Sequence, residues 1–241
     1  PRQQHRGVRV SAAQHGAPHS VAFEVSQRRW ASPGVGEEPS LKVALAHRAR
    51  ADSRDDAALP SRGARLQHSF ELAGFPCGAH FWREALAAEA HATRGRAVLS
   101  LCGSLGLLQG LGPEPSCVLD KHFLGGPDKH SLGGPGSLRG FLPSGAGPRL
   151  AAAAGGGPAG GDLSCMLGAA ASWRLPLPAA WAGALPAARA QLWANAGSVV
   201  AAPQGDNVLT HLPSLLREVP PLPPPLPAAC CPLPARARRA R

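Results

Sequence analysis

Bulky apolar side chains are scarce in this sequence, which has no isoleucine and no tyrosine. Valine, phenylalanine and tryptophan together supply 23 of the 241 residues, whereas alanine alone supplies 45 and glycine plus proline supply 55. An alanine methyl group buries little surface, so the burial energy open to a core is small against a backbone ordering cost of about 1 to 2 kcal/mol per residue. The sequence therefore predicts a mostly disordered, irregular, low-complexity chain.

The ordered elements expected in such a chain are a few short α-helices, with no β architecture. Only 12 valines and 2 threonines carry β-branched side chains, too few for a convincing set of strands. Phe81–Arg94 consists of strong helix formers, with Phe81, Ala85 and Leu86 near one side. Ser40 can cap a weaker helix over residues 41–52, and residues 187–196 can form a third after Pro186.

Charge and composition divide the chain into four segments. The net charge is +10, with 14 basic against 9 acidic residues in 1–96, 6 against 5 in 97–216 and 5 against 1 in 217–241. The nearly uncharged middle predicts loose collapse and poor solubility. The expected segments are an irregular polar part (1–38), a weakly helical part (39–96), a Gly/Ala/Leu/Pro-rich low-complexity region (97–216) and a Pro-rich basic tail (217–241).

A tandem octapeptide occupies residues 120–135, where DKHFLGGP is followed by DKHSLGGP. The Gly-Gly-Pro endings suit turns, and two copies are too few to build a solenoid. Two interpretations remain open: a repeated binding epitope, or a duplication tolerated because nothing packs there. Residues 151–161 (AAAAGGGPAGG) have the composition of a flexible linker.

Cysteine and histidine spacing gives little support for a metal site. Only one pair is tight, Cys77 with His80, and its further partners would be His91 and Cys102. A looser group consists of Cys117, His122 and His130. We therefore expect no metal and no cofactor. Six cysteines in so long a chain do not indicate a disulfide scaffold, so the sequence assigns no compartment.

No catalytic signature is present, and we expect no enzyme. The nearest approach to a nucleophile elbow is Cys102–Gly106, where cysteine replaces the first glycine. The longest apolar run, Ala97–Leu111, is too short for a membrane helix and contains glycine and glutamine, so no membrane span is expected.

The Pro-rich tail offers the only binding mechanisms that the sequence supports. Arg217, Pro220 and Pro223 fit the R-x-x-P-x-x-P spacing of a polyproline II ligand for SH3-type domains. The chain ends in a basic cluster formed by Arg236, Arg238, Arg239 and Arg241. This cluster could contact nucleic acid, although no aromatic residue lies in it for base stacking.

The leading interpretation is a disordered chain or fragment without a dedicated function, in keeping with a bias toward residues that have G- and C-rich codons. The first alternative is an interaction protein whose tail binds SH3-type domains. The second is a weak nucleic-acid binder that uses the C-terminal arginines. The oligomeric state is not assigned.

Overall fold

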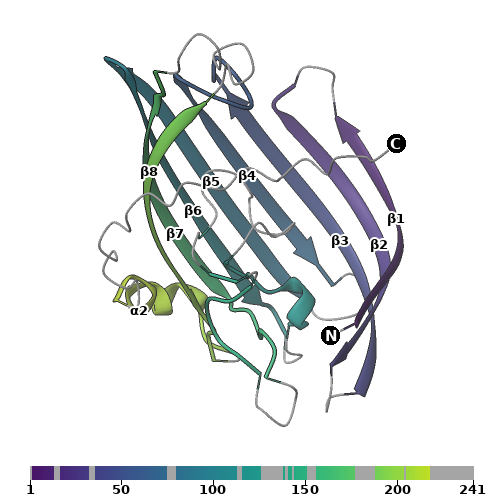
Figure 1. Cartoon of the computed structure of the whole chain (residues 1–241). Helices are drawn as coiled ribbons and strands as arrows, with labels where there is room; N and C mark the ends of the chain where they lie inside the picture. The colour runs from purple at the N-terminus through teal and green to yellow at the C-terminus, as the bar shows by residue number, and fades with distance from the viewer. Residues whose placement is uncertain are drawn as a thin grey trace, which may run out of the picture.

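The computed structural model describes residues 2–13, 17–32, 36–74, 80–112, 116–125, 138, 141–142, 144–150, 156–176, 188–203 and 205–217. Within these ranges the chain forms a single antiparallel sheet in which each strand pairs with the next along the chain. The strands are β1 (Arg2–Ala13), β2 (His19–Ser32), β3 (Gly36–Asp52), β4 (Gly63–Ala73), β5 (Phe81–Arg94), β6 (Ala97–Gly110), β7 (Leu163–Arg174) and β8 (Arg189–Val200). Figure 1 shows that the sheet curves, so that β1 and β8 lie on opposite sides of a hollow.

Helices in the described ranges are few and short. They are the 3-10 turns η1 (Val118–Asp120) and η3 (Val208–His211) and the helix α2 (Leu212–Arg217). None of these described helices is long and apolar enough to cross a membrane. The segment that holds η1 lies in front of the sheet, within the hollow (Figure 1).

The expectation of a mostly disordered chain with short helices and no β architecture is wrong. Phe81–Arg94 is strand β5, residues 41–52 belong to β3, and most of 187–196 belongs to β8. Alanine, leucine and glutamate favour helix only weakly, by fractions of a kcal/mol per residue. A strand in this sheet gains hydrogen bonds from a neighbouring strand on each side, and its side chains pack on alternate faces. Together these gains outweigh the helix preference.

The strand register divides the side chains between two faces. Residues that lie opposite each other in antiparallel strands share a face. On the outer, convex face one such row joins β1 to β5 and is apolar throughout: Val10, Phe23, Leu45, Leu72 and Trp82. On the concave face, one row across β1, β2 and β3 consists of Gly7, Ser26 and Lys42. Along these rows the sheet is apolar outside and polar inside; elsewhere on the convex face His68 and Glu84 form a polar pair.

Apolar packing is spread over three small clusters. The first lies on β3–β6 and consists of Ala44, Ala73, Phe81 and Leu108. The second places Leu124 and Leu138 against Met166 and Val199, and the third packs η3 and α2 against Leu163. The composition predicted disorder because it offers too few bulky side chains for one large core. A fold whose apolar packing is spread over small clusters does not need such a core.

Candidate functional site

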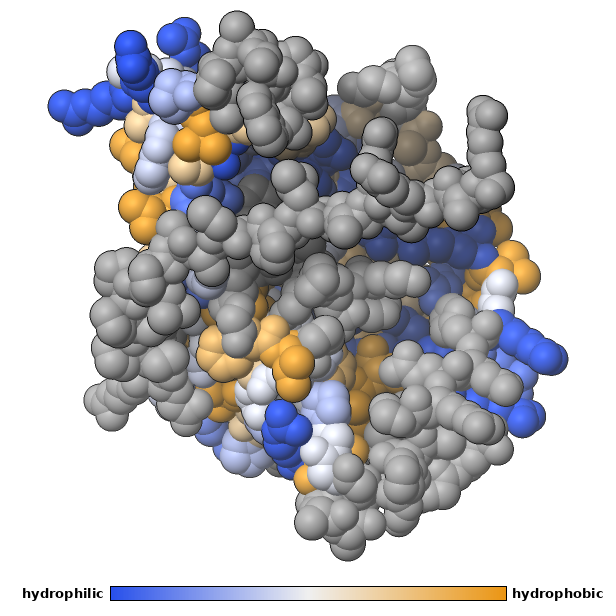
Figure 2. All heavy atoms as spheres, in the orientation of Figure 1, coloured by the Kyte–Doolittle hydropathy of each residue, from blue (hydrophilic) through white to orange (hydrophobic). Residues whose placement is uncertain are grey.

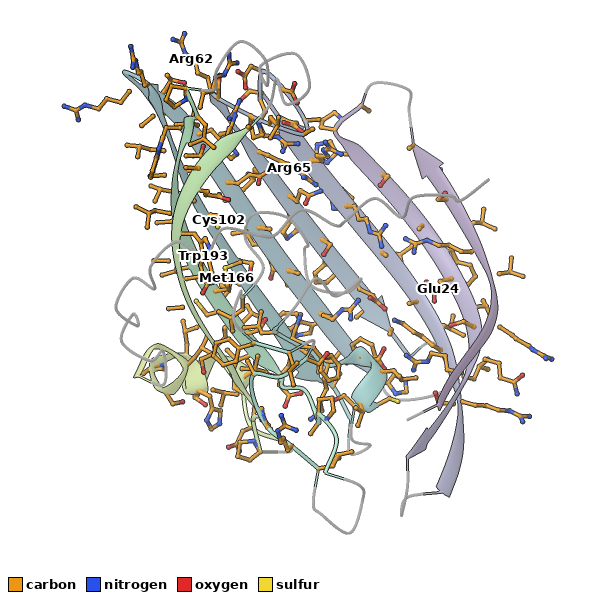
Figure 3. All side chains as sticks on the ribbon, in the orientation of Figure 1. Glu24, Arg62, Arg65, Cys102, Met166 and Trp193 are labelled. Carbon is orange, nitrogen blue, oxygen red and sulfur yellow. The ribbon has the colours of Figure 1, made fainter. Side chains whose placement is uncertain are left out.

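The concave face encloses a cavity of about 930 Å³. Its wall comes from β1 to β7, and residues 119–124 close part of it. Figure 2 shows hydrophilic atoms inside this hollow and hydrophobic atoms at its outer margins. In Figure 3, Glu24 lies on the β2 side of the hollow, whereas Cys102 and Met166 lie across from it on β6 and β7. This polar cavity is the candidate site.

Asp120, from the first copy of the octapeptide, is bound to the wall of this cavity. Its carboxylate is 1% exposed and accepts a hydrogen bond from Nη1 of Arg28 over 2.6 Å. The ammonium of Lys42 lies 3.3 Å from the same oxygen. The interpretation that nothing packs at the octapeptide is therefore wrong for its first copy, and residues 126–135 lie outside the described part of the chain.

Two further residues complete what we call the ion-pair cluster: Arg28, Lys42, Glu71, Arg83 and Asp120. Lys42 pairs with Glu71, and Nη2 of Arg83 donates to the other oxygen of Glu71 over 2.8 Å. Nη1 of Arg83 donates to the backbone carbonyl of Asp120 over 3.1 Å. Three cations thus surround two carboxylates in a poorly solvated place. Removal of one partner would leave a buried charge without compensation, which is costly.

His122 anchors the same segment two residues further on. Its backbone forms a two-way bridge with Gly161, with N–O distances of 2.8 and 2.9 Å. A Cβ at Gly106 of β6 would lie 2.6 Å from the Nδ1 atom of His122, so the close approach requires glycine there. Burial lowers the pKa of His122 to about 4, and its Nε2 atom is shielded from solvent without a partner among the described residues. The ring is therefore neutral near pH 7.

Among the described residues, the cysteine and histidine groups that come nearest to metal-ligand spacing do not converge. His91 contacts the hydroxyl of Ser100 at 2.9 Å, and the Cys102 thiol donates to the carbonyl of Gly168. Cys77 and His130 lie outside the described residues. Within the described ranges no group of three or more histidine, cysteine and acidic side chains is placed to hold a metal.

Of the tail residues singled out from the sequence, the structure describes Arg217, which does not line the cavity. Arg217 ends α2, and the remaining predicted contacts lie outside the described residues: Pro220, Pro223, Arg236, Arg238, Arg239 and Arg241. Sequence reasoning also missed four members of the ion-pair cluster, Arg28, Lys42, Glu71 and Arg83, and singled out Asp120 only as part of the octapeptide. The signal that could have found them is period-two alternation, as in β2, where Glu24 and Ser26 alternate with Phe23 and Val25.

A curved antiparallel sheet with an apolar outer face and a polar hollow has the features of the wall of a β-barrel. Residues 11–210 match the family model described as the Omp85 superfamily domain, and the chain belongs to that superfamily. The solved structure of BamA from Haemophilus ducreyi lacking POTRA domains 1-3 superposes with a TM-score of 0.63 at 13% identity, over 82% of this chain and 42% of that one.

Two of the relatives that are similar in sequence have the same name. The Sorting and assembly machinery component 50 homolog of Xenopus tropicalis is 31% identical over 188 residues, which cover 76% of this chain and 38% of that protein. The human homolog of the same name is 30% identical over 207 residues, or 82% of this chain and 42% of the relative. The chain thus spans about two fifths of the length of these relatives.

Family membership corrects the functional interpretation of the sequence. A chain of which residues 11–210 form an Omp85 superfamily domain is neither a disordered low-complexity chain nor a chain without a selected function. The same finding overturns the expectation of SH3-type or nucleic-acid partners. Both expectations rested on the tail, which lies outside the matched domain.

Proposed function

We propose that this chain forms part of a membrane β-barrel that serves in the sorting and assembly of β-barrel membrane proteins. The observation that carries the proposal is the difference between the two faces of the sheet: the convex face has an apolar row from β1 to β5, whereas the concave face holds the ion-pair cluster. In a bilayer the convex face would contact lipid, and the concave face would line a water-filled space. The proposed role in sorting and assembly is supported by the names of the proteins that are similar in sequence.

Strand length and exposure support the membrane placement. Each strand has between 11 and 17 residues, and about 9 to 11 tilted residues are enough to cross the hydrocarbon layer. Large apolar side chains are exposed along the convex face, with Val8 at 69%, Leu101 at 63% and Leu167 at 60%. A continuous apolar surface of this kind promotes aggregation in water, whereas lipid accommodates it.

Aromatic residues lie near both ends of the strands on the convex face. Trp82 is the second residue of β5 and Trp173 is the last but one of β7, and these positions are at opposite ends of the sheet. Phe70 stacks against Trp82 with ring centroids 6.5 Å apart. Aromatic girdles at both interfaces are typical of membrane β-barrels. The absence of a long apolar run in the sequence fits this arrangement, because only alternate residues would face lipid.

The proposed role is structural and mechanical. It requires a shaped surface on which another chain can fold, and no bond is made or broken. The concave face supplies a rigid wall, because the ion-pair cluster fixes residues 116–125 to β2, β3, β4 and β5.

Lipid exposure can be tested with single-tryptophan variants that keep Trp82, Trp173 or Trp193. Register places Trp193 opposite Ala170 on the concave side, so it is the matched control. In vesicles that contain brominated lipids we expect strong quenching of Trp82 and Trp173 fluorescence and weak quenching of Trp193. Equal quenching of all three would contradict the membrane placement.

The assembly role can be tested with the same vesicles. An unfolded outer-membrane β-barrel protein is added, and its folding is followed by the shift in electrophoretic mobility. We expect folding to be faster when the chain is present than in vesicles with an unrelated membrane β-barrel. An unchanged rate in vesicles that pass the quenching test would reject the assembly role and leave the membrane placement in force.

A further inference from the structure

A second part of the concave wall carries hydrogen-bond donors next to the ion-pair cluster. Register places Ser20, Arg48 and Ser69 opposite one another on β2, β3 and β4. Gln67 lies two residues from Ser69 along β4, and all four residues line the cavity. We call this group the donor patch. On β4 it begins two residues from Glu71, so it continues the ion-pair cluster along the strand.

The donor patch has no bound acceptor. In the part of the chain that the structure describes, Ser20, Arg48, Gln67 and Ser69 make no side-chain hydrogen bond and no ion pair. The neighbouring Arg50, by contrast, is held by Asp52, with an N–O distance of 2.6 Å. Arg50 and every member of the ion-pair cluster therefore have a partner of opposite charge within 4 Å, whereas Arg48 has none among the described residues.

Charge in the cavity favours an anion at this place. The described lining residues include seven cations and three acidic residues, namely Arg9, Arg28, Lys42, Arg48, Arg50, Arg83 and Lys121 against Glu24, Glu71 and Asp120. Arg28, Lys42 and Arg83 share the carboxylates of Glu71 and Asp120. Three more of these cations also have an acidic partner, in the pairs Arg9–Glu24, Arg50–Asp52 and Lys121–Asp162, so Arg48 is the lining cation without one among the described residues. The guanidinium of Arg48 is exposed in the hollow, and its planar array of donors matches a carboxylate.

The chain itself shows how this wall binds polypeptide. Residues 116–125 run through the hollow mostly without regular secondary structure, and they deliver one carboxylate, that of Asp120, between Arg28 and Lys42. We propose that the donor patch binds a carboxylate side chain of a second acidic polypeptide segment that enters the hollow beside residues 116–125. This inference assigns a ligand class to the cavity and does not depend on the assembly role.

The test measures binding of labelled peptides to the full chain in detergent micelles by fluorescence anisotropy. We expect oligoglutamate to bind and oligolysine not to bind. Arg48→Gln should weaken oligoglutamate binding about tenfold, because a hydrogen bond to a charged group is lost. Arg48→Lys, which keeps the charge but not the fork of donors, should weaken it about threefold.

The matched control is Arg62→Gln. Arg62, labelled in Figure 3, is an exposed arginine in the segment between β3 and β4, and it does not line the cavity. The Arg62→Gln variant removes the same charge as Arg48→Gln and should leave oligoglutamate binding unchanged. If Arg48→Gln fails to fold, as judged by circular dichroism, Ser69→Ala removes a neutral donor from the same patch and should weaken binding about threefold.

Three results would overturn the proposal. Arg62→Gln could weaken binding as much as Arg48→Gln, which would indicate attraction by net charge alone. Oligoglutamate binding could be indifferent to both Arg48 and Ser69. Finally, oligothymidylate could bind more tightly than oligoglutamate in an Arg48-dependent manner, which would assign the patch to phosphate groups.

Discussion

At the scale of single residues, Asp120 fixes the segment inside the hollow. Asp120→Asn removes a buried charge and leaves Arg28 and Lys42 undercompensated, so we expect a loss of about 3 kcal/mol in the free energy of unfolding. Urea unfolding in detergent, followed by tryptophan fluorescence, measures this loss. Asp206→Asn is the control: its ion pair with His211 is exposed and should contribute at most about 1 kcal/mol. Equal losses in the two variants would contradict the role of Asp120.

His122 makes stability depend on pH. Its folded pKa of about 4 lies below the unfolded value of 6.5, so the unfolded chain takes up a proton first as the pH falls. The contribution of His122 to the free energy of unfolding is fully present above pH 6.5. It is lost progressively between pH 6.5 and 4, by about 3 kcal/mol in total. His122→Leu should remove this part of the pH dependence. Parallel pH profiles for the two proteins would show that His122 is not buried in its neutral form.

At the scale of elements, strand β6 tests the close approach of the inserted segment. Gly106→Ala would place a Cβ against Ser164 and His122, and overpacking of this kind costs about 1 to 3 kcal/mol. Gly110 lies in the same strand and faces open space, so Gly110→Ala should be nearly neutral. Denaturant midpoints of the two variants give the comparison. A neutral Gly106→Ala would mean that the segment does not touch β6.

Strand β3 offers a test of the two faces in adjacent residues. Leu45 is 52% exposed on the convex face, whereas Ala46 lines the cavity. Leu45→Lys should destabilise the protein in lipid vesicles by about 2 to 4 kcal/mol, because the ammonium would lie in hydrocarbon. Ala46→Lys adds the same charge to the polar hollow and should cost less than half as much. If the order is reversed, the assignment of the faces is wrong.

At the scale of the whole molecule, the sheet should depend on an apolar environment outside it. We expect circular dichroism in detergent to show β-sheet with little helix. Dilution out of detergent should cause aggregation, because the convex face would be exposed to water. If the protein stays soluble and gives a coil-like spectrum both in detergent and after dilution, the sheet is excluded.

Some properties of this protein were fixed by the sequence alone. The basic net charge and the shortage of bulky side chains follow from composition, although the disorder inferred from that shortage was wrong. The distinctive octapeptide was also visible, and its first copy supplies Asp120 and His122 to the candidate site. The period-two pattern of Phe23, Glu24 and Val25 was present as well, although alanine and glycine weaken such a signal elsewhere.

Only the tertiary structure decided that these residues form strands and which of them meet. The helix propensity of Phe81–Arg94 depends on the local sequence and amounts to fractions of a kcal/mol per residue. The hydrogen bonds that make this segment a strand come from β4 and β6, which are separate segments of the chain. The ion-pair cluster likewise joins Arg28 to Asp120 across 92 residues. Contacts of that separation exist only after the sheet has curved around its hollow, so no local pattern could have predicted them.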